Sequence, residues 1–282
     1  MQNTKKTINA KNIIVLVLLI LASAIILAPF LFMLISSFKP GRELMRYGIN
    51  LNIDLNIMSF DNYGLLVTDR DGAYMHWYKN SLIITTMHTV LALFLTSMVG
   101  YGLAVYNFKG RNLIFLTVLA VMMVPIEILI LPLYRLTVFM NIINTYWGVV
   151  LPFVVSPFAV FFFRQYAVGL PKEFIDAGRI DGCGEFGIYF RIMMPLMTPA
   201  FGAMAILQAM TSWNSFVWPL IVLRTTENFT LTIGLSSLIT PYGNNYDLLI
   251  AGSVMSVIPL IVLFLLNQKA FISGLTIGGV KG

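Results

Sequence analysis

Long apolar stretches separated by short polar ones run along almost the whole chain. A helix of about 20 apolar residues crosses the roughly 30 Å hydrocarbon core of a bilayer. On this basis the pattern predicts six membrane-spanning helices, at residues 13–38, 81–106, 113–134, 145–163, 196–223 and 248–266. The first stretch is longer than the roughly 7 to 15 apolar residues of a signal-peptide core, so we expect it to remain as an anchor.

The polar stretches between these spans give the expected organisation of an all-α membrane protein with six transmembrane helices. We expect a terminal segment at 1–12, a first span at 13–38, an outer segment at 39–80, a core of spans two to six at 81–267, and a tail at 268–282. Within the core, 168–195 and 224–247 are predicted to be polar loops. The first of these loops is charged and the second carries aromatic and small residues.

Composition supports the membrane assignment and excludes other classes. Hydrophobic residues make up 58% of the 282 residues and charged residues 11%, whereas a soluble domain has about 25% charged residues. The net charge of +6 does not indicate a nucleic-acid-binding protein, because the basic residues are dispersed among apolar spans rather than clustered on one stripe.

The distribution of basic residues predicts the orientation. Short cytoplasmic loops of membrane proteins carry an excess of Lys and Arg. With the N-terminus inside, eleven basic residues lie on the cytoplasmic side, namely Lys5, Lys6, Lys11, Lys109, Arg111, Arg164, Lys172, Arg179, Arg191, Lys269 and Lys281. Seven lie outside, namely Lys39, Arg42, Arg46, Arg70, Lys79, Arg135 and Arg224. We therefore expect both termini and the charged loop to be cytoplasmic.

The charged loop contains the stretch "PKEFIDAGRIDGCGEFGIYFRIMMP" and is predicted to form a helix, a turn and a second helix. Pro171 suits a helix start, and Gly182 stands where a left-handed residue would end the first helix. Lys172 and Asp176 are four residues apart and Asp176 and Arg179 three apart, which favours ion pairing along the helix. Two interpretations fit these residues about equally: a helix that docks on a partner, and an amphipathic connector lying on lipid headgroups.

One face of that first helix carries Phe174, Ala177, Gly178 and Asp181 at positions i, i+3, i+4 and i+7. Glycine inside a helix costs about 1 kcal/mol relative to alanine. We therefore expect Ala177 and Gly178 to form a small-residue face against which another surface packs closely.

Polar residues inside the predicted spans are candidates for a transport pathway, because they usually face an interior rather than lipid. Glu127 follows Pro125, which is expected to kink the third span. Gln208, Trp213, Asn214 and Ser215 form a second polar group in the fifth span. The alternative for Glu127 is a protonated or Arg-paired acid at a helix interface.

No catalytic or metal-binding motif stands out. The pattern G-x-x-x-x-G-K-[ST] of a nucleotide-binding loop is absent. The histidines are His76 and His88, without cysteines or clustered carboxylates at ligand spacing. His76 fits an aromatic belt and His88 a satisfied packing residue, and the lone Cys183 is expected to do no covalent chemistry.

The charged loop resembles the cytoplasmic signature of the membrane subunits of binding-protein-dependent ABC importers. That signature has the form E-A-A, three residues, G, nine residues, I, one residue, L-P. Here Asp176-Ala177-Gly178 stands for E-A-A, Gly182 for the glycine, Ile192 for the isoleucine and Met194-Pro195 for L-P. Three side chains depart from the pattern while the spacing is kept.

Further stretches are similar to the carbohydrate importer permeases of the MalG-like branch and follow in the same order. They are "NSLIITT", "GYGLAVYNFKGRN", "MMVPIEILILPLY", "SWNSFVWPL" and "GLTIGGVKG". An arabinose or arabino-oligosaccharide permease is one candidate within this branch.

The resemblance implies the type I ABC importer permease fold in the plasma (inner) membrane of a bacterium. Its partners would be a second homologous permease, two ATPase subunits that bind ATP and Mg, and an extracellular sugar-binding protein, with no cofactor on this chain. Coupling to the ATPase would use Glu173, Phe174, Asp176, Ala177, Gly178, Asp181, Gly182, Ile192 and Pro195. Contacts with the binding protein would use Thr240, Pro241, Tyr242 and Gly243.

Three further expectations concern the pathway residues, the tail, and the alternative function and substrate. In such permeases sugar contacts fall mostly on the partner permease, so Glu127, Gln208, Trp213, Asn214 and Ser215 are expected to line or gate the pathway. The tail would enter the ATPase dimer interface. An ATP-independent secondary transporter or channel is the alternative function, and a polyol or glycerol phosphate is the alternative substrate.

Overall fold

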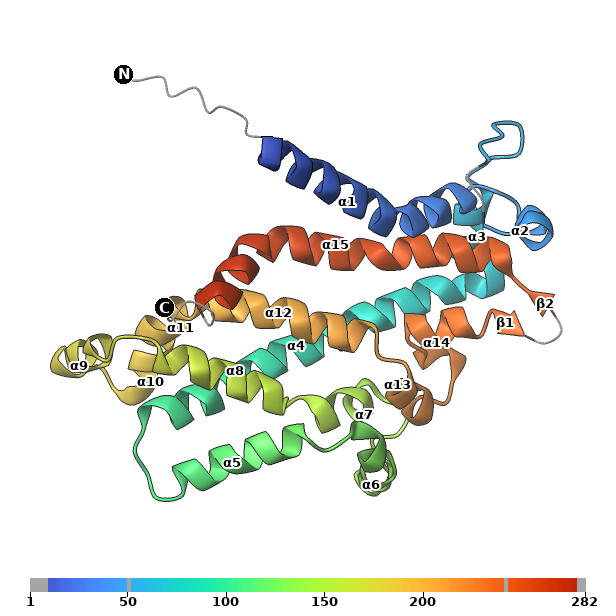
Figure 1. The fold of residues 1–282 in the computed structure, drawn as a ribbon. Coiled ribbons are helices and arrows are strands. Elements are labelled where there is room, and N and C mark those ends of the chain that lie inside the picture. The colour runs from blue at the N-terminus through green and yellow to red at the C-terminus, as the bar shows by residue number, and fades with distance from the viewer. Residues whose placement is uncertain (1–9, 50–51, 241–242, 278–282) are drawn as a thin grey trace. The chain divides into compact units, whose positions relative to one another are not determined.

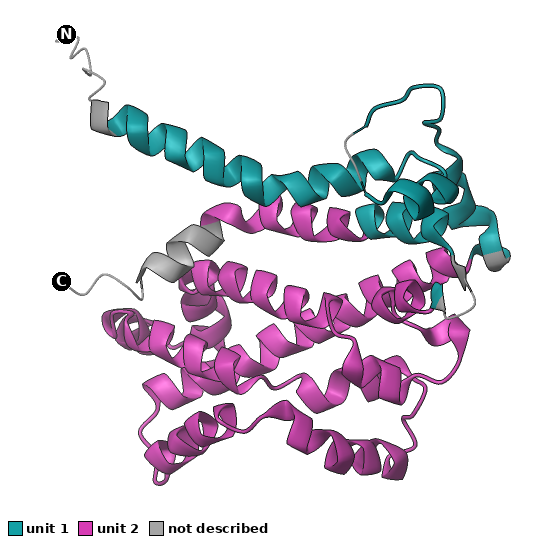
Figure 2. Cartoon of the chain, turned by 45° about the vertical axis from the view of Figure 1, so that its right-hand side comes forward, with its two compact units in different colours: residues 1–72, 238–255 teal, residues 73–237, 256–282 magenta. Residues whose placement is uncertain are grey.

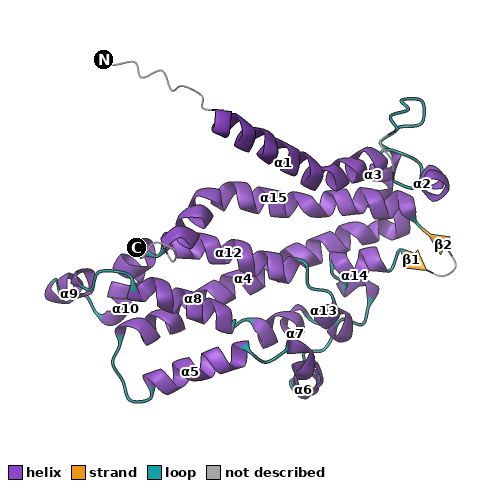
Figure 3. Cartoon of the chain, viewed as in Figure 1, coloured by secondary structure: helices purple, strands orange, loops and turns teal. Residues whose placement is uncertain are grey.

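The computed structural model describes residues 10–49, 52–240 and 243–277, which are helical for most of their length (Figure 3). The chain divides into two compact units (Figure 2). Unit 1 contains residues 1–72 and 238–255, and unit 2 contains residues 73–237 and 256–282.

Unit 1 holds the first long helix and several short elements. These are α1 Ala10–Ser36, α2 Gly41–Tyr47, α3 Asp61–Thr68, η1 Asp69–Gly72, the strands β1 Ile239–Thr240 and β2 Gly243–Asn244, and the first part of α15 Tyr246–Ile277. The strands pair antiparallel with Thr240 opposite Gly243. The buried Asn62 of α3 donates hydrogen bonds to the carbonyls of Ser37 and Lys39, which fixes the chain just after α1.

The long helix α1 leaves its apolar surface exposed. Its 27 residues rise about 40 Å at 1.5 Å per residue. Large side chains such as Leu16, Leu19 and Ile25 are at least half exposed within the chain. A surface of this kind is stable in hydrocarbon rather than in water, which agrees with the predicted first span.

Unit 2 holds the remaining helices around α4. Its elements are α4 Ala73–Val105, α5 Arg111–Met122, α6 Ile126–Phe139, α7 Tyr146–Val150, η2 Leu151–Phe153, α8 Pro157–Val168, α9 Glu173–Ile180, α10 Glu185–Ile188, the π-helical η3 Tyr189–Met193, α11 Met194–Leu196, α12 Thr198–Trp213, α13 Val217–Val222, η4 Thr226–Asn228, α14 Leu231–Ser236 and the rest of α15.

The helix α4 packs against α8 and α12 (Figure 1). The closest approach of α4 and α8 is at Gly100, where a Cβ atom would lie 2.7 Å from Phe163 Cβ and 2.8 Å from the Arg164 nitrogen. Phe163 is fully buried there and touches the ring of Phe201. The absence of a side chain at Gly100 thus permits this helix crossing.

Within the part of the chain that the structure describes, three single helices are long and apolar enough to cross a membrane, at Asn12–Ser36, Ala73–Val105 and Tyr246–Lys269. Three bent pairs bring the number to as many as six if each pair counts as one span. The pairs are Arg111–Met122 with Ile126–Phe139, bent by 105°, Tyr146–Phe153 with Pro157–Val168, bent by 48°, and Glu185–Leu196 with Thr198–Trp213, bent by 77°.

Prolines explain why these predicted spans are broken. A proline lacks an N–H group and clashes with the carbonyl four residues earlier. Pro125, Pro157 and Pro199 each stand at or beside the first residue of the helix that follows a break. The kink expected at Pro125 is confirmed and is a complete break.

One predicted span needs correction, and the helix of another is longer than its apolar part. The fifth span, expected over 196–223, is interrupted after Trp213 and resumes only as the short helix α13. Pro219 lies four residues after Ser215, so a continuous helix would clash there. The helix that contains the second predicted span begins earlier, at Ala73, because Tyr74, Trp77 and Asn80 are buried within unit 2 and extend the helix beyond its apolar part.

Gly100 and Gly102 provide a matched pair for testing the α4–α8 crossing. A Cβ atom at Gly102 meets nothing within 4 Å. We expect Gly100→Ala to lower the free energy of unfolding by about 1–3 kcal/mol through overpacking, and Gly102→Ala to leave it unchanged or slightly higher. Thermal unfolding of the purified chain in detergent measures both, and equal stability of the two variants would contradict this account.

Candidate functional site

The charged segment, residues 171–195, begins with α9 and its left-handed cap. Gly182 has φ +76°, with open space around it, so its glycine is required by backbone conformation and not by crowding. The Cys183 N–H donates to the Gly178 carbonyl at 2.9 Å and the Gly182 N–H to the Arg179 carbonyl at 3.1 Å. These two bonds form a Schellman motif, and the predicted cap at Gly182 is confirmed.

The two residues of the predicted small-residue face of α9, Ala177 and Gly178, have different surroundings in the structure. Gly178 is buried, and a Cβ atom on it would lie 2.7 Å from Ile192 Cδ1 and 3.1 Å from Ile188 Cγ1. Gly178 therefore packs against the following helices of its own chain, and the expectation that it faces a partner is wrong. Ala177, by contrast, is exposed.

The outer side of α9 remains open in this chain. Glu173, Phe174, Asp176 and Asp181 are exposed like Ala177, and the Asp176 side chain has 69% of its surface free. Glu173 and Asp176 lie in the first turn of the helix, where the helix dipole favours negative charge.

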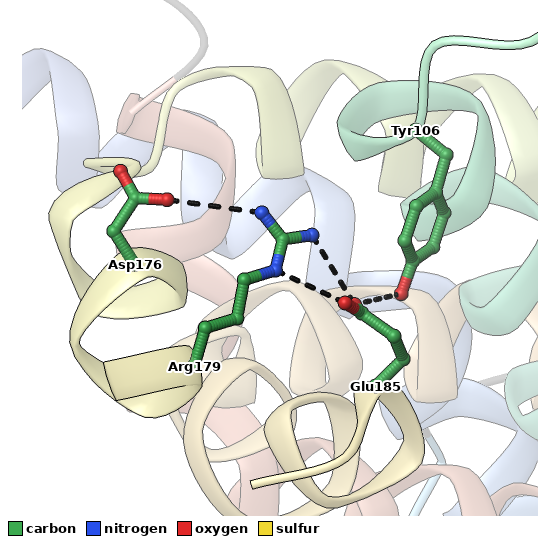
Figure 4. Close-up of polar contacts among 4 residues, drawn as sticks. All are labelled: Tyr106, Asp176, Arg179 and Glu185. Carbon is green, nitrogen blue, oxygen red and sulfur yellow. Dashed lines mark hydrogen bonds and ion pairs between the residues drawn. The ribbon is translucent and has the colours of Figure 1, made fainter. Parts of the chain in front are cut away.

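An ion-pair network joins α9 to the helices beside it (Figure 4). Arg179 donates through Nε to Glu185 Oε1 at 3.0 Å and through Nη2 to Glu185 Oε2 at 3.3 Å. Tyr106, which follows α4, donates its hydroxyl to Glu185 Oε2 at 2.7 Å. Asp176 lies 3.7 Å from Arg179 Nη1, as its i, i+3 spacing predicts.

The electrostatics of this network agree with its geometry. The hydrogen bond and charge of Glu185 raise the pKa of the Arg179 guanidinium above its usual value. Burial first, and then the hydrogen bond to Glu185, raise the pKa of the Tyr106 phenol. Both groups therefore keep their protons across the physiological range, and the Tyr106–Glu185–Arg179 link persists.

Sequence reasoning missed Glu185 and Tyr106 as partners of Arg179. Glu185 lies six residues after Arg179, beyond the Gly182 turn, so no helical spacing connects them. Tyr106 lies 79 residues from Glu185. The expected pair of Lys172 and Asp176 is not formed among the described residues, and Asp176 lies near Arg179 instead.

The remaining signature residues lie in the second arm of the charged segment. Ile192 is partly buried in the π-helical η3, next to Gly178. Pro195 lies in α11 and is exposed. Because Pro195 cannot donate to a carbonyl four residues back, a π-type turn just before it is expected.

A second candidate site is a cavity of about 700 Å³ inside unit 2. Three interruptions of helical backbone line it, at residues 123–125, 154–156 and 214–216, together with α4 and α12. Irregular backbone at membrane depth is tolerated only where it is buried in protein or lines a water-filled cavity. Broken helices of this kind form the substrate sites of many transporters.

The structure brings together three of the five predicted pathway residues. Glu127, Gln208 and Ser215 all line the cavity. Glu127 is exposed in the first turn of α6 and makes no ion pair with a described residue, so the Arg-paired form of the alternative interpretation finds no partner there.

Trp213 and Asn214 do not line the cavity. Trp213 is buried and donates its indole N–H to the Ser256 carbonyl at 3.1 Å. Asn214 donates its amide to the Met210 carbonyl at 2.9 Å. Gln208 before the helix end and Ser215 after it therefore share the cavity, whereas Trp213 and Asn214 make their hydrogen bonds elsewhere.

Sequence reasoning placed His88 among satisfied packing residues, and the structure corrects this in part. His88 lines the cavity and is buried, with Nε2 3.3 Å from the Phe153 carbonyl oxygen. Its Nδ1 has no hydrogen-bond partner among the described residues. Thr211 and Ser212 also line the cavity, and their position beside the predicted polar group could have indicated them.

The base of the loop at 224–247 is fixed by side chains from the start of α4. Asn80 donates to the carbonyls of Glu227 and Phe229 at 2.6 and 2.9 Å, and Trp77 donates to the Thr226 carbonyl at 3.0 Å. The predicted contact residues Thr240 and Gly243 pair in the β1–β2 hairpin. Pro241, Tyr242 and the last five residues of the tail lie outside the described residues.

Comparisons with known proteins agree on one family. Residues 92–275 match the family model described as "Binding-protein-dependent transport system inner membrane component". The chain is 61% identical over 260 residues to the arabinooligosaccharides transport system permease protein AraQ of Bacillus subtilis (strain 168), covering 92% of each chain. It is 31% identical to the lactose transport system permease protein LacG of Rhizobium radiobacter, covering 93% of each.

The fold is also that of a solved transporter structure. A chain of a bacterial ABC transporter involved in the import of the acidic polysaccharide alginate superposes with a TM-score of 0.78 at 20% sequence identity. The match covers 96% of this chain and 100% of that one.

The network around Arg179 predicts how firmly α9 is held. We expect Arg179→Glu to speed amide hydrogen exchange in residues 173–180 a few-fold, more at low salt, because it replaces an attraction to Glu185 by a repulsion. Hydrogen exchange with mass spectrometry measures this rate. The double variant Arg179→Glu with Glu185→Arg should recover slow exchange, and failure of this rescue would contradict the ion-pair account.

Proposed function

The chain belongs to the family of binding-protein-dependent transport system inner membrane components and is a permease subunit of a sugar ABC importer, and from this we propose that it imports arabinose-containing oligosaccharides. The observation that carries the substrate proposal is the 61% identity to AraQ over nearly the full length, against 31% to LacG. A second arabinooligosaccharide permease, from Halalkalibacterium halodurans, is 56% identical.

The charged segment is the proposed coupling element. Its helix α9 docks in a cleft of a cytoplasmic ATPase subunit through the exposed side that carries Phe174, Ala177 and Asp181. Asp176 is exposed enough to accept a hydrogen bond from a basic residue of that subunit. Gly178 and Ile192 act within the chain, by holding α9 against the second arm of the segment.

The Tyr106–Glu185–Arg179 link would couple movement of the docked helix α9 to α4. It connects α9 to the end of α4, and α4 also lines the cavity at Ile84 and His88. Movement of α9 during ATP-driven closure of the ATPase dimer would therefore be transmitted to a wall of the pathway. The free energy for alternating access comes from contacts of the ATPase that differ between the two states.

The remaining partners follow from the same assignment. A second permease completes the pathway, two ATPase subunits bind ATP and Mg, and an extracellular protein delivers the sugar to the loop at 224–247. Both termini and the charged segment face the cytoplasm, in keeping with the excess of basic residues there. Trp77 and Asn80 hold the base of this loop through hydrogen bonds to the carbonyls of Thr226, Glu227 and Phe229.

An ATP-independent transporter or channel is the alternative function. It would explain the cavity but not the exposed side of α9. Uptake by the chain alone in liposomes would favour the alternative, whereas dependence on ATPase and binding protein favours the importer.

Docking through α9 is tested at Ala177, whose exposure allows a large side chain without disturbing the fold. We expect Ala177→Trp to lower binding-protein-stimulated ATP hydrolysis in the reconstituted complex at least about ten-fold, because a bulky residue at a closely packed interface cannot be accommodated. Ala177→Ser is the matched control and should behave as wild type. Unchanged stimulation in Ala177→Trp would refute docking through this side.

The substrate proposal is tested by uptake into proteoliposomes holding this chain, its partner permease, the ATPase and the binding protein. We expect ATP-dependent uptake of radiolabelled arabinotriose and much slower uptake of maltotriose and lactose. Equal uptake of all three sugars, or uptake of maltotriose alone, would contradict the arabino-oligosaccharide assignment while leaving the importer class intact.

A further inference from the structure

We propose that the cavity of this chain is itself a binding subsite for one uncharged sugar ring, with Gln208 and His88 as the residues that contact its hydroxyl groups. The inference rests on the proposed function and goes beyond it, because sugar contacts in such permeases were expected on the partner subunit. It is carried by the position, bonding and neighbours of these two side chains.

Gln208 and His88 lie on the rigid side of the cavity. Gln208 comes from α12 and His88 from α4, two helices that pack against each other. Both side chains are buried, with 5% and 6% of their surface exposed, and both line the cavity. Side chains fixed on packed helices are held more precisely than side chains on loops.

His88 has unused hydrogen-bonding capacity. Its buried Nδ1 has no partner among the described residues, and the Gln208 side chain lines the same cavity. Buried polar groups are nearly always hydrogen-bonded, and leaving one unpaired costs about 1–3 kcal/mol. A hydroxyl group both donates and accepts, so a sugar could satisfy an amide and an imidazole at once.

The other walls of the cavity suit a sugar ring. Phe153, Phe158, Phe216 and Trp218 supply aromatic surface, and Ser212 and Ser215 supply further hydroxyl groups. A volume of about 700 Å³ lies within the roughly 300–1,000 Å³ of small-molecule sites, which combine apolar walls with a few placed polar groups.

The charged residues that line the cavity indicate which class of sugar it can bind. Among the described residues that line the cavity there is no Lys or Arg, and Glu127 is the carboxylate at its rim. A phosphate or carboxylate on the ligand would lose hydration without gaining a cation from the described lining residues. The subsite therefore favours a neutral sugar over glycerol phosphate or an acidic saccharide.

Occupancy is tested by protection of a cysteine placed in the cavity of the assembled complex. Ser215→Cys in a Cys183→Ser background leaves a single thiol in the chain, since Cys183 is its one cysteine. We expect saturating arabinotriose to slow alkylation of this thiol at least about five-fold and glycerol 3-phosphate to have no effect. A thiol that is unreactive in every condition, or protected equally by glycerol 3-phosphate, would overturn the proposal.

The contacting residues are tested by shape-preserving substitutions in the same complex. We expect Gln208→Met and His88→Phe each to lower arabinotriose uptake and its protection of the Ser215→Cys thiol about ten-fold, the loss expected for an unpaired polar contact. Gln165→Met, at an exposed position of α8 outside the cavity, is the control. Wild-type protection in both variants, or equal loss in the control, would overturn the assignment.

Assembly is monitored in every variant by co-elution with the ATPase and by ATP hydrolysis stimulated by the binding protein. If both persist while no sugar protects the cavity thiol, the subsite is refuted and the importer assignment stands. If this chain never associates with an ATPase, the proposed function itself has failed.

Discussion

The satisfaction of backbone hydrogen bonds in an apolar surrounding is the constraint on which the rest of this structure depends. Within hydrocarbon a continuous helix is the simplest solution, because it pairs every N–H and carbonyl internally. This chain interrupts its helices at residues 123–125, 154–156 and 214–216, and all three interruptions line one cavity. Three of the places where the helical solution fails therefore border the cavity, while the break at residue 197 lies elsewhere in unit 2.

In the charged segment, some residues make contacts within the chain and others stay exposed, where a partner can bind them. Gly178, Gly182, Ile188 and Ile192 shape the hairpin internally, through a close approach and a left-handed cap. Arg179 donates a hydrogen bond to Glu185, and Glu185 also accepts a hydrogen bond from the Tyr106 hydroxyl. The exposed surface of α9 has the small residue Ala177 at its centre. The Tyr106–Glu185–Arg179 network connects this helix to its neighbours.

Much of the site was predictable because its signals are local. The Asp176–Arg179 pair, the cap at Gly182 and the break at Pro125 each depend on residues a few positions apart. The contacts of Gly178 with Ile188 and Ile192, of Arg179 with Glu185, and of His88 with the cavity wall depend on how separate helices pack, and no spacing rule contains that information. Within the polar group around Trp213, Gln208 and Ser215 line the cavity while Trp213 and Asn214 make hydrogen bonds elsewhere, and this division also depends on packing.

The sequence by itself determined the membrane class, the helical content, the family and the positions of the charged segment, because composition, apolar length and motif spacing are properties of the chain alone. Tertiary structure decided at which prolines a helix breaks. Pro29, Pro132 and Pro259 lie inside α1, α6 and α15, whereas Pro125, Pro157 and Pro199 begin new helices after sharp bends. The residue type is the same in both groups, and at membrane depth a break persists only where protein or a water-filled cavity surrounds the backbone groups that it sets free.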